Sequence, residues 1–498
     1  MSKVLSDLQF DVKSNVVDKV QIQEVFNYFE TLSSIPRGSG NEKEVSDYMV
    51  TFAKNLGLEV KQDQNYNIYI YKPATKGYEN CPTVILQGHL DIVCEKDKET
   101  EFDFEKQGLN LFIDGDWIKA KGTTLGADNG VSIAYQMAVL ADNTLEHPAL
   151  ECLMTTEEET GMGGVDNMHP EYLNGKILIN IDTTHEGEFL VSCAGGARAY
   201  LSLPLEFEDN SSENVSYHVH IQGLVGGHSG GEIHHERANA NVLMGRVLEV
   251  CNNKYNIKLS TIDGGTKDNV ITRECDATIS VQKSQSEAFL KTIQELEQSF
   301  KDEYSAQDPN IFILAKQVDT AGQVIKDDVL EKLISIIRLL PYGVQGMSHQ
   351  LENLVETSLN VGILTIENGE FLAKTSVRSS VLTRKLELLS RVEWVAKLSG
   401  AKCDIGSDYP AWQYAPESKI RDLAVKVYNE KYETPAEIKA VHAGLECGFL
   451  SQKLEGVDMI AFGPNMLEIH SPNERVSISS MARVYDYVAT LLKEMKNY

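Results

Sequence analysis

Short apolar runs that alternate with helix-like segments constrain the fold of this chain more than any other feature. The run TVIL at residues 83–86 is apolar and rich in β-branched residues, as a buried central strand requires. Residues 150–154 and 177–181 repeat this pattern, and residues 130–140 are predicted to form a helix. Strand–helix–strand order predicts an α/β domain with a mostly parallel central sheet.

An amphipathic helix is expected before these runs. Apolar residues recur with spacings of three, four and seven between Val45 and Leu56. Asn41 is followed three residues later by Glu44, which resembles a capping box. The helix is therefore expected to begin at this pair.

The pattern changes near Gly195. From about residue 197 to residue 409, the strands alternate polar and apolar residues, as in VSYHVHIQ at 215–222, and helical segments lie between them. After Trp412 the first pattern returns and ends in a strand at 458–462. We therefore predict one α/β domain, residues 1–196 and 410–498, that is interrupted by an inserted α+β domain, residues 197–409, with two similar halves.

Five segments place metal-binding types of side chain directly after strand-like runs. In open α/β sheets, ligand sites lie outside the carboxyl ends of the strands. The residue types are histidine and carboxylate, found at His89 and Asp91, at Asp128, in the triplet 157–159, at Asp182 and at His470. Together they match the ligand inventory of a two-metal site with a bridging carboxylate. Such ligands without thiolate favour Zn²⁺, Mn²⁺ or Co²⁺ over softer metals.

Each segment alone also has an ordinary structural explanation. His89 and Asp91 could be a hydrogen-bonded polar pair; at a metal site, Asp91 would accept the second ring N–H of His89. The acidic triplet could be a solvated turn, and Asp128 could cap the helix that follows it. Asp182 could be a loop residue and His470 a buried imidazole, so only the combination favours a metal site.

The motifs GHLDIV, GADNG, EEETG, NIDT and EIHSPNE occur in this order. They resemble the aminoacylase and carboxypeptidase clan of di-zinc peptidases, and more closely the bacterial aminoacyl-histidine dipeptidases, also called cytosol non-specific dipeptidases. Supporting motifs span nearly the whole chain: SIPRGSGNE, SCAGG, GGHSGGEIH, ETSLNVG, YPAW and HAGLECG. The resemblance implies a di-zinc exopeptidase-like catalytic domain interrupted by a lid domain, and hydrolysis of dipeptides such as β-Ala-His, with specificity that could be broad.

The resemblance also assigns residues to two divalent metal ions. The assignments are His89 and Asp182 to one ion, Glu159 and His470 to the other, and Asp128 to both. The family spacing Glu-Glu-x-Gly selects Glu158 as general base and leaves Glu157 as an extra residue. The ions, expected to be Zn²⁺ with Mn²⁺ or Co²⁺ as alternatives, would share a water and lower its pKa.

Further residues are expected to act on the substrate. Glu158 would take a proton from the water and pass it to the leaving amine. His228 in GGHSGG matches the lid histidine that stabilises the oxyanion in the resembled family. Arg378 could bind a terminal carboxylate bidentately, with Asn269 as a second candidate, although a surface salt bridge is the commoner role of an arginine. Closure of the lid over the metal ions is expected.

Two other functions stay open. An N-acyl amino acid deacylase or a carboxypeptidase of the same clan would share the metal site, and only the pocket would distinguish it. The long insertion and HAGLECG favour the dipeptidase. A metal-binding protein without turnover would keep the ligands, but the presence of Glu158 and His228 weighs against it.

The charge balance bears on partners and location. Forty-six Lys and Arg against 73 Asp and Glu give a formal net charge of −27, which repels phosphate backbones and anionic membranes. The first residues, MSKVLSDLQFDVKSN, lack the apolar core of a signal peptide. The eight cysteines are scattered without a CxxC pair. We therefore expect a cytoplasmic protein that binds a small peptide and no nucleic acid or membrane, with an inserted domain that either supports a homodimer or mimics one internally.

Overall fold

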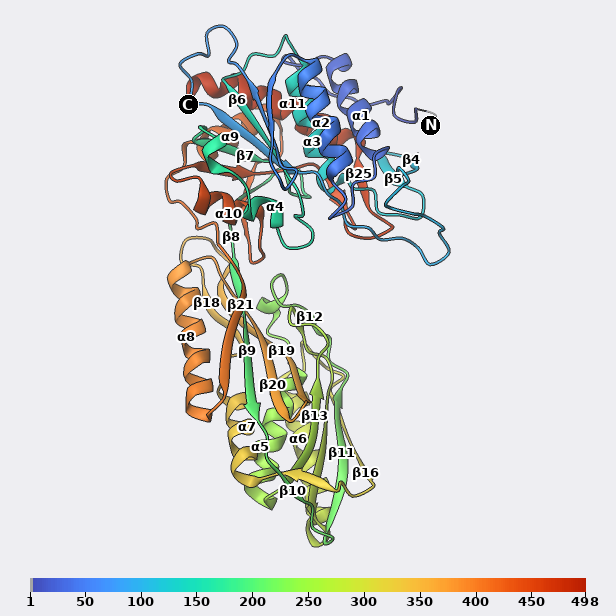
Figure 1. The fold of residues 1–498 in the computed structure, drawn as a ribbon, viewed down its shortest axis with the longest axis vertical. Helices are drawn as coiled ribbons and strands as arrows, with labels where there is room; N and C mark the ends of the chain where they lie inside the picture. Colours follow the sequence, from blue (N-terminus) through green and yellow to red (C-terminus); the bar gives the residue numbers. More distant parts are fainter. Residues whose placement is uncertain (1–2) are drawn as a thin grey trace. The chain divides into compact units, whose positions relative to one another are not determined.

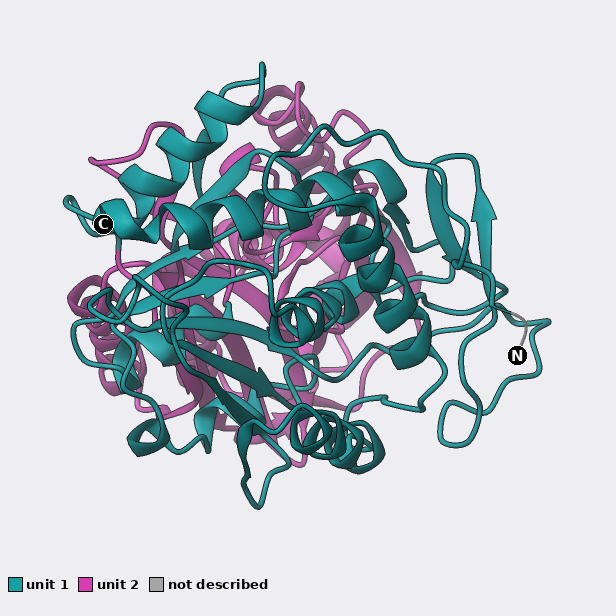
Figure 2. Cartoon of the chain, turned by 90° about the horizontal axis from the view of Figure 1, so that it is seen from above, with its two compact units in different colours: residues 1–192, 414–440, 445–498 teal, residues 193–413, 441–444 magenta. Residues whose placement is uncertain are grey.

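The protein is represented by a computed structural model, in which residues 3–498 are described. The chain divides into two compact units (Figure 2). Unit 1 comprises residues 1–192, 414–440 and 445–498, and unit 2 comprises residues 193–413 and 441–444. The sequence predicts an insertion from residue 197 to residue 409, whereas the main segment of unit 2 runs from residue 193 to residue 413. The sequence does not predict that the short segment 441–444 belongs to unit 2.

Unit 1 is built on an eight-stranded sheet with the order β1-β2-β6-β3-β7-β23-β8-β22. Figure 1 labels β6, β7 and β8 of this sheet. The four central strands β6, β3, β7 and β23 are parallel, whereas β1, β2 and β8 pair antiparallel with their neighbours. The predicted α/β class is therefore confirmed, with the parallel strands confined to the centre. The strands are β1 Glu59–Gln62, β2 Ile68–Lys72, β3 Val84–His89, β6 Leu150–Thr155, β7 Ile177–Asn180, β8 Glu188–Cys193, β22 Glu437–Val441 and β23 Asp458–Ala461.

Helices of unit 1 pack on this sheet and on one another, and a small sheet with the order β24-β25-β5-β4 lies beside them. The helices are α1 Lys19–Ser33, α2 Lys43–Asn55, α3 Ala127–Ala141, α4 Gly163–Asp166, α9 Lys419–Lys431, α10 Glu446–Lys453 and α11 Ile478–Glu494. The small sheet contains β4 Leu111–Asp114, β5 Trp117–Ala120, β24 Met466–Leu467 and β25 Arg475–Ser477. Within residues 3–498, no helix has both the length and the apolar character needed to cross a membrane.

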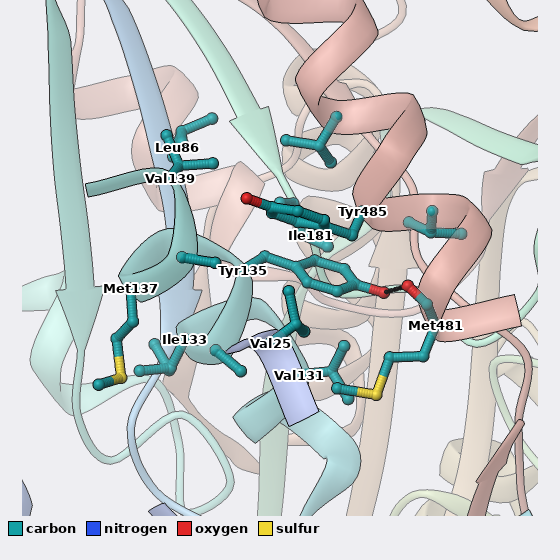
Figure 3. Packing of buried hydrophobic residues seen from close by; sticks show 14 of the residues in the cluster. Val25, Leu86, Val131, Ile133, Tyr135, Met137, Val139, Ile181, Met481 and Tyr485 are labelled. Atoms are coloured by element: carbon teal, nitrogen blue, oxygen red, sulfur yellow. Dashed lines mark hydrogen bonds between the residues drawn. The ribbon is translucent and has the colours of Figure 1, made fainter. Parts of the chain in front are cut away.

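Part of the core of unit 1 lies where α3 and α11 meet, next to Leu86 of β3 (Figure 3). Tyr135 of α3 is fully buried, and its hydroxyl donates to the backbone oxygen of Met481 at 2.7 Å. The Tyr135 ring also packs on Tyr485, with ring centroids 5.8 Å apart. A buried tyrosine is stable when its hydroxyl has a partner, so this contact holds α3 and its N-terminal end against α11.

The start of α2 differs from the expected capping box. The helix begins at Lys43 with Glu42 as N-cap, and no side chain caps it. The Glu42 carboxylate instead accepts the backbone N–H of Gly40 at 2.9 Å and of Glu157 at 3.1 Å. The predicted box at Asn41 was therefore wrong, because a contact distant in sequence uses the carboxylate at the helix start.

Unit 2 is built on one antiparallel sheet, with the strand order β16-β11-β15-β13-β19-β20-β9-β21 and β18 paired to β19. Its strands are β9 Gly195–Pro204, β11 Asn214–Gln222, β13 Lys258–Gly264, β15 Cys275–Gln282, β16 Phe312–Val318, β18 Gly343–Met347, β19 Val355–Glu367, β20 Glu370–Ser379 and β21 Lys402–Tyr409. Its helices are α5 Ala240–Tyr255, α6 Ser286–Glu303, α7 Asp327–Leu339 and α8 Leu382–Ser399. Two short ribbons pair β10 Phe207–Asp209 with β17 Gln323–Ile325, and β12 Gly227–His228 with β14 Val270–Ile271.

The sheet of unit 2 has two halves with the same element order. One half runs β11-α5-β13-β15-α6-β16. The other begins with β9 and resumes as α7-β19-β20-α8-β21, with the short β18 between α7 and β19. From the edge of the sheet inward, the strands of the first half are β16, β11, β15 and β13, and those of the second half are β21, β9, β20 and β19. In both halves this order is the fourth, first, third and second strand along the chain. The halves join where Asp263 of β13 pairs with Thr365 of β19.

Candidate functional site

Three adjacent parallel strands of unit 1 end at one edge of the sheet and carry candidate ligands. β3 ends at His89, which lies opposite Thr155 at the end of β6. Glu158 and Glu159 follow β6, and Asp182 follows β7 on the other side of β3. The register therefore brings these side chains to a common edge, where open α/β sheets bind ligands.

His89, Asp128 and Asp182 form one group whose ligand atoms all lie within 4.8 Å of one another. The Nε2 atom of His89 lies 3.2 Å from Asp128 Oδ1 and 3.7 Å from Asp182 Oδ1. His89 is 1% exposed, so its imidazole is fixed by its surroundings. One imidazole and two carboxylates at this spacing can hold a divalent cation.

Asp128, Glu159 and His470 form a second group with the same spacing. The Nε2 atom of His470 lies 3.2 Å from Asp128 Oδ2 and 3.1 Å from Glu159 Oε1. Asp128 thus belongs to both groups and turns one oxygen toward each histidine. Sharing one carboxylate between two cations is the arrangement that two-metal hydrolytic sites use.

The residues of this second group fit a metal ion because their carboxylate oxygens outnumber the protons available to them. The imidazole of His470 can donate from Nε2 to one oxygen, and Glu159 Oε1 is left buried without a hydrogen bond from any described residue. The two carboxylates raise the pKa of His470 to about 10, so a proton occupies this group when no metal is bound. A divalent cation would replace that proton and satisfy both oxygens.

In the group of His89, Asp128 and Asp182, the two carboxyl groups lie close together and disfavour each other's ionisation. Burial raises the pKa of Asp182 well above its ordinary value, and the nearby Asp128 carboxylate raises it further. The side-chain amide of Asn129 donates to Asp182 Oδ1 at 2.6 Å. A cation between these carboxylates would remove the repulsion that one amide offsets only in part.

Asp91 lies behind His89, on the side away from Asp128. The Nδ1 atom of His89 lies 3.1 Å from the backbone oxygen of Asp91 and 3.4 Å from its Oδ1. Burial alone would raise the pKa of Asp91, but bonds from His89, Ser39 and the backbone N–H of Glu159 lower it. An anionic Asp91 favours the His89 tautomer that leaves Nε2 free for a metal.

Glu158 lies in a third group, with His89 and Glu159. Burial raises its pKa well above the ordinary value, and Asp182 contributes to the rise despite the opposing effect of His89. A carboxylate whose pKa moves toward neutrality is a better proton acceptor at neutral pH. The backbone N–H of Glu158 donates to Asp91 Oδ1 at 3.1 Å, which fixes the start of this turn.

Glu157, the extra glutamate of the triplet, lies outside all three groups found within residues 3–498. Its backbone has a φ of 54°, in the left-handed region, and its side chain reaches toward Gly163. A Cβ atom added at Gly163 would lie 2.2 Å from Glu157 Oε2. The turn therefore directs Glu157 away from the ligands and leaves Glu158 and Glu159 facing them.

Glu446 is a buried carboxylate near the site to which the sequence alone assigned no role. It accepts Gln87 Nε2 at 2.5 Å and Thr155 Oγ1 at 2.9 Å, and Gln87 Oε1 accepts the Asn180 amide at 2.6 Å. Burial raises the pKa of Glu446 to about 7. The network joins the ends of β3, β6 and β7, and the motif HAGLECG was its only local signal.

His228, in unit 2, lies at the end of the short strand β12 and is fixed as one tautomer. Its Nδ1 accepts the backbone N–H of Gly230 at 3.2 Å and of Gly231 at 3.0 Å. Burial, followed by the positive charge of Arg378, lowers its pKa. The imidazole is therefore neutral and carries its proton on Nε2, which can donate.

Arg378 and Arg198 lie on adjacent strands of unit 2 and on the same face of the sheet. Arg198 of β9 lies opposite Ser376 of β20, two residues before Arg378. Arg198 Nε donates to Asp268 at 2.6 Å, and Arg378 Nη1 donates to the Tyr409 hydroxyl at 2.9 Å. The partly buried Arg198 is therefore paired with a carboxylate, whereas the buried Arg378 has no carboxylate partner among the described residues.

His442 completes what we call the basic cluster, which consists of Arg198, Ser376, Arg378 and His442. Its Nε2 lies 2.7 Å from the Ser358 hydroxyl. Burial, then Arg378, lowers its pKa to about 3. Buried atoms of all four cluster residues lack hydrogen-bond partners within residues 3–498: Arg198 Nη1, Ser376 Oγ, Arg378 Nε and His442 Nδ1. Such unused donors suit an anionic group.

Asn269 is close to His228 through the backbone. Its carbonyl oxygen accepts the N–H of Ser229 at 2.9 Å. Val270, the next residue, pairs with His228 in the β12–β14 ribbon. The structure thus associates Asn269 with the loop of His228, within the same unit as Arg378.

Comparison with known proteins places the chain in a family. A family model described as "Peptidase family M20/M25/M40" matches residues 85–494. The cytosol non-specific dipeptidase of Escherichia coli K12 is 37% identical over 475 residues, which cover 95% of this chain and 98% of that protein.

Solved structures agree with this match. The crystal structure of aminoacylhistidine dipeptidase from Vibrio alginolyticus superposes with a TM-score of 0.90 at 34% identity, covering 95% of this chain and 96% of that chain. Aminopeptidase PepT from Bacillus cereus shares the fold with a TM-score of 0.54 at 14% identity, covering 95% and 98% of the two chains. Because the family model and a curated relative cover most of its length, the chain belongs to peptidase family M20/M25/M40.

Proposed function

We propose that this chain, a peptidase by family, is a two-metal dipeptidase in which His89, Asp128, Glu159, Asp182 and His470 hold the ions. The observation that carries the proposal is the position of Asp128, whose two oxygens each lie 3.2 Å from a different histidine. Two divalent cations, expected to be Zn²⁺ with Mn²⁺ or Co²⁺ as alternatives, would polarise the scissile carbonyl and lower the pKa of the attacking water.

Glu158 is the proposed general base. Its raised pKa suits a group that takes a proton from water and returns it to the leaving amine. The adjacent Glu159 faces His470 at 3.1 Å and is better placed as a ligand. Asp91 supports the site by holding the tautomer of His89.

The proposed substrate-binding residues belong to unit 2. A neutral His228 carries its proton on Nε2 and can donate it in a hydrogen bond to an oxyanion. The imidazole does not have to be positively charged for this role. Arg378, whose Nε has no hydrogen-bond partner among residues 3–498, can bind a terminal carboxylate, and Asn269 lies beside the His228 loop. Closure of the inserted domain over the metal ligands is part of the proposal.

The proposed substrate class is a dipeptide, because the curated relative is named a non-specific dipeptidase and the solved relative an aminoacylhistidine dipeptidase. Xaa-His dipeptides such as β-Ala-His belong in the first test, together with others that would reveal broad specificity. We further propose that the protein acts in the cytoplasm, without nucleic-acid or membrane partners, and that the inserted domain either forms a homodimer or mimics one internally.

The experiment is a substrate panel with metal analysis of the same sample. Chain stripped by a chelator and reloaded with Zn²⁺, Mn²⁺ or Co²⁺ is assayed with dipeptides, tripeptides and N-acyl amino acids. The proposal expects dipeptide hydrolysis with two metal ions per chain. Cleavage of longer peptides or N-acyl amino acids alone would identify a carboxypeptidase or deacylase, and metal binding without hydrolysis would identify a non-catalytic metal-binding protein.

A further inference from the structure

Two buried charged side chains, Arg37 and Glu474, connect the loops that carry the ligands around Asp128. They are 2% and 3% exposed. Both lie in motifs noted in the sequence, SIPRGSGNE and EIHSPNE, without a role for either residue. Their hydrogen bonds go almost entirely to backbone atoms of neighbouring loops, as the following contacts show.

Glu474 binds the backbone at the start of α3. Its two oxygens accept the four successive N–H groups of residues 125–128, at 2.8, 3.0, 2.8 and 3.4 Å. Converging N–H groups at the N-terminal end of a helix favour an anion. Because Glu474 follows His470 by four residues, its carboxylate ties the His470 loop to the Asp128 loop.

Arg37 binds the opposite edge of the same loop. Its Nη2 donates to the Gly126 carbonyl at 2.7 Å, and its Nη1 donates to the Leu90 carbonyl at 2.8 Å. Leu90 directly follows His89, so the guanidinium ties the end of β3 to the Asp128 loop. The loop is thus held by a guanidinium group on its carbonyl side and by a carboxyl group on its N–H side.

The two glycines of GADNG leave the space that the guanidinium occupies. A Cβ atom at Gly130 would lie 2.4 Å from Arg37 Nη2. At Gly126, where φ is +65°, a Cβ atom would lie 3.0 Å from the same nitrogen and 2.6 Å from Ile92 Cγ2. The motif therefore serves the fit of Arg37 as well as the turn.

We propose that Arg37 and Glu474 are a pair of positioning residues that set the spacing of the two metal groups, by holding the Asp128 loop between the His89 and His470 loops. Asp128 must present one oxygen to each histidine at the same time, so a small shift of its backbone changes both distances. The inference rests on the proposed two-metal site and assigns neither residue a contact with metal or substrate.

The first test is Glu474→Gln in the full-length chain. The amide keeps the size of the side chain but leaves one acceptor oxygen for four N–H groups. We expect Zn²⁺ to bind about 10–100-fold more weakly in the Asp128, Glu159 and His470 group, as is usual for changes behind a ligand. Competition of the metal-free chain with a chromophoric chelator measures this, and kcat for a dipeptide should fall with little change in KM.

The second test separates the effect of Arg37 from that of Glu474. It uses a His470→Ala background, in which only the His89, Asp128 and Asp182 group is left to bind one Zn²⁺. There, Arg37→Lys should weaken Zn²⁺ binding about 10–100-fold. Glu474→Gln should weaken it less, because Arg37 still ties the Asp128 loop to the end of β3. Gly130→Ala should reproduce the Arg37→Lys effect. Since alanine favours a helix over glycine, loss of helix propensity would not explain that result.

Glu151→Gln is the matched control. Glu151 is also a buried carboxylate of unit 1, 4% exposed, and it accepts the backbone N–H groups of Asn174 and Gly175 at 2.9 Å. It lies near the start of β6, at the end of the sheet away from the ligands. Glu151→Gln should lower the melting temperature and leave Zn²⁺ affinity unchanged.

The proposal is overturned if Glu474→Gln loses stability like the control and still binds two Zn²⁺ ions with wild-type affinity. Should Glu474→Gln not fold, Arg37→Lys in the His470→Ala background decides, and unchanged Zn²⁺ affinity there would also overturn it. A wild-type chain that binds two Zn²⁺ ions but hydrolyses no dipeptide would contradict the proposed function instead, because the affinity measurements do not depend on turnover.

Discussion

Unit 1 and unit 2 each collect buried polar side chains, but with opposite charge. In unit 1, burial and neighbouring carboxylates raise the pKa values of Glu158 and Asp182. In unit 2, burial and then neighbouring positive charge lower the pKa of His442 to about 3, and burial lowers that of Arg378. Burial disfavours charge in both units, so each cluster needs a partner of opposite sign.

The difference indicates what each unit is suited to bind. Two groups of carboxylates and imidazoles with unsatisfied oxygens suit divalent cations. A basic cluster with unused N–H donors suits a carboxylate. A peptide substrate needs both, since its carbonyl has to be polarised and its terminal carboxylate has to be recognised.

The largest effect that would sharpen the comparison is expected from Glu158→Gln in unit 1. The amide cannot accept the proton of water, so kcat for a dipeptide should fall about 10²–10⁴-fold. Both metal ions should remain bound, because Glu158 is the proposed base and not a ligand. Steady-state kinetics with metal analysis of the same sample checks this, and a variant that keeps most of its kcat would show that another group takes the proton.

An intermediate effect is expected from Arg378→Ala in unit 2. Loss of a charge-assisted contact of about 1.5–3 kcal/mol should lower kcat/KM about 10–100-fold, mainly through a higher KM. Metal content should stay at the wild-type level. An amidated dipeptide is the control, since wild type and variant should cleave it with similar efficiency if Arg378 binds the terminal carboxylate; an equal loss on both substrates would contradict that role.

The smallest effect concerns pH and His442. Its pKa is about 3 in the folded chain and about 6.5 when unfolded, so the unfolded chain binds an extra proton between these values. This group therefore lowers the free energy of unfolding as pH falls below 6.5, by about 1–2 kcal/mol at pH 5. Urea unfolding at pH 7 and pH 5 should show a smaller acid loss for His442→Asn than for wild type, and an equal loss would mean that His442 does not resist protonation.

The sequence predicted the elements that carry a local pattern. The buried runs at 83–86, 150–154 and 177–181 correspond to β3, β6 and β7, and the family resemblance is confirmed. The antiparallel pairing of the outer strands could not be predicted, because a short apolar run has the same pattern in either direction. The predicted capping box at Asn41 failed because Glu42 binds the backbone of Glu157, a partner more than 100 residues away.

The same distinction holds for the candidate site. The spacing of His89 and Asp91, and of the glutamates in EEETG, is local and visible in the sequence. Glu446 and Glu474 act on backbone or side chains about 290 to 360 residues away, so no periodicity or spacing indicates their partners. The partners of such buried carboxyl groups can be identified only from the three-dimensional structure, which brings the distant loops together.

Metal stoichiometry of the Asp128→Ala variant tests the central claim, that one carboxylate serves two metal ions, most directly. Equilibrium dialysis of the metal-free chain against Zn²⁺ should give two ions for wild type and one each for His89→Ala and His470→Ala. Asp128→Ala should lose tight binding of both ions while the chain stays folded. Retention of one tightly bound ion by Asp128→Ala, or a single ion in the wild type, would contradict the account.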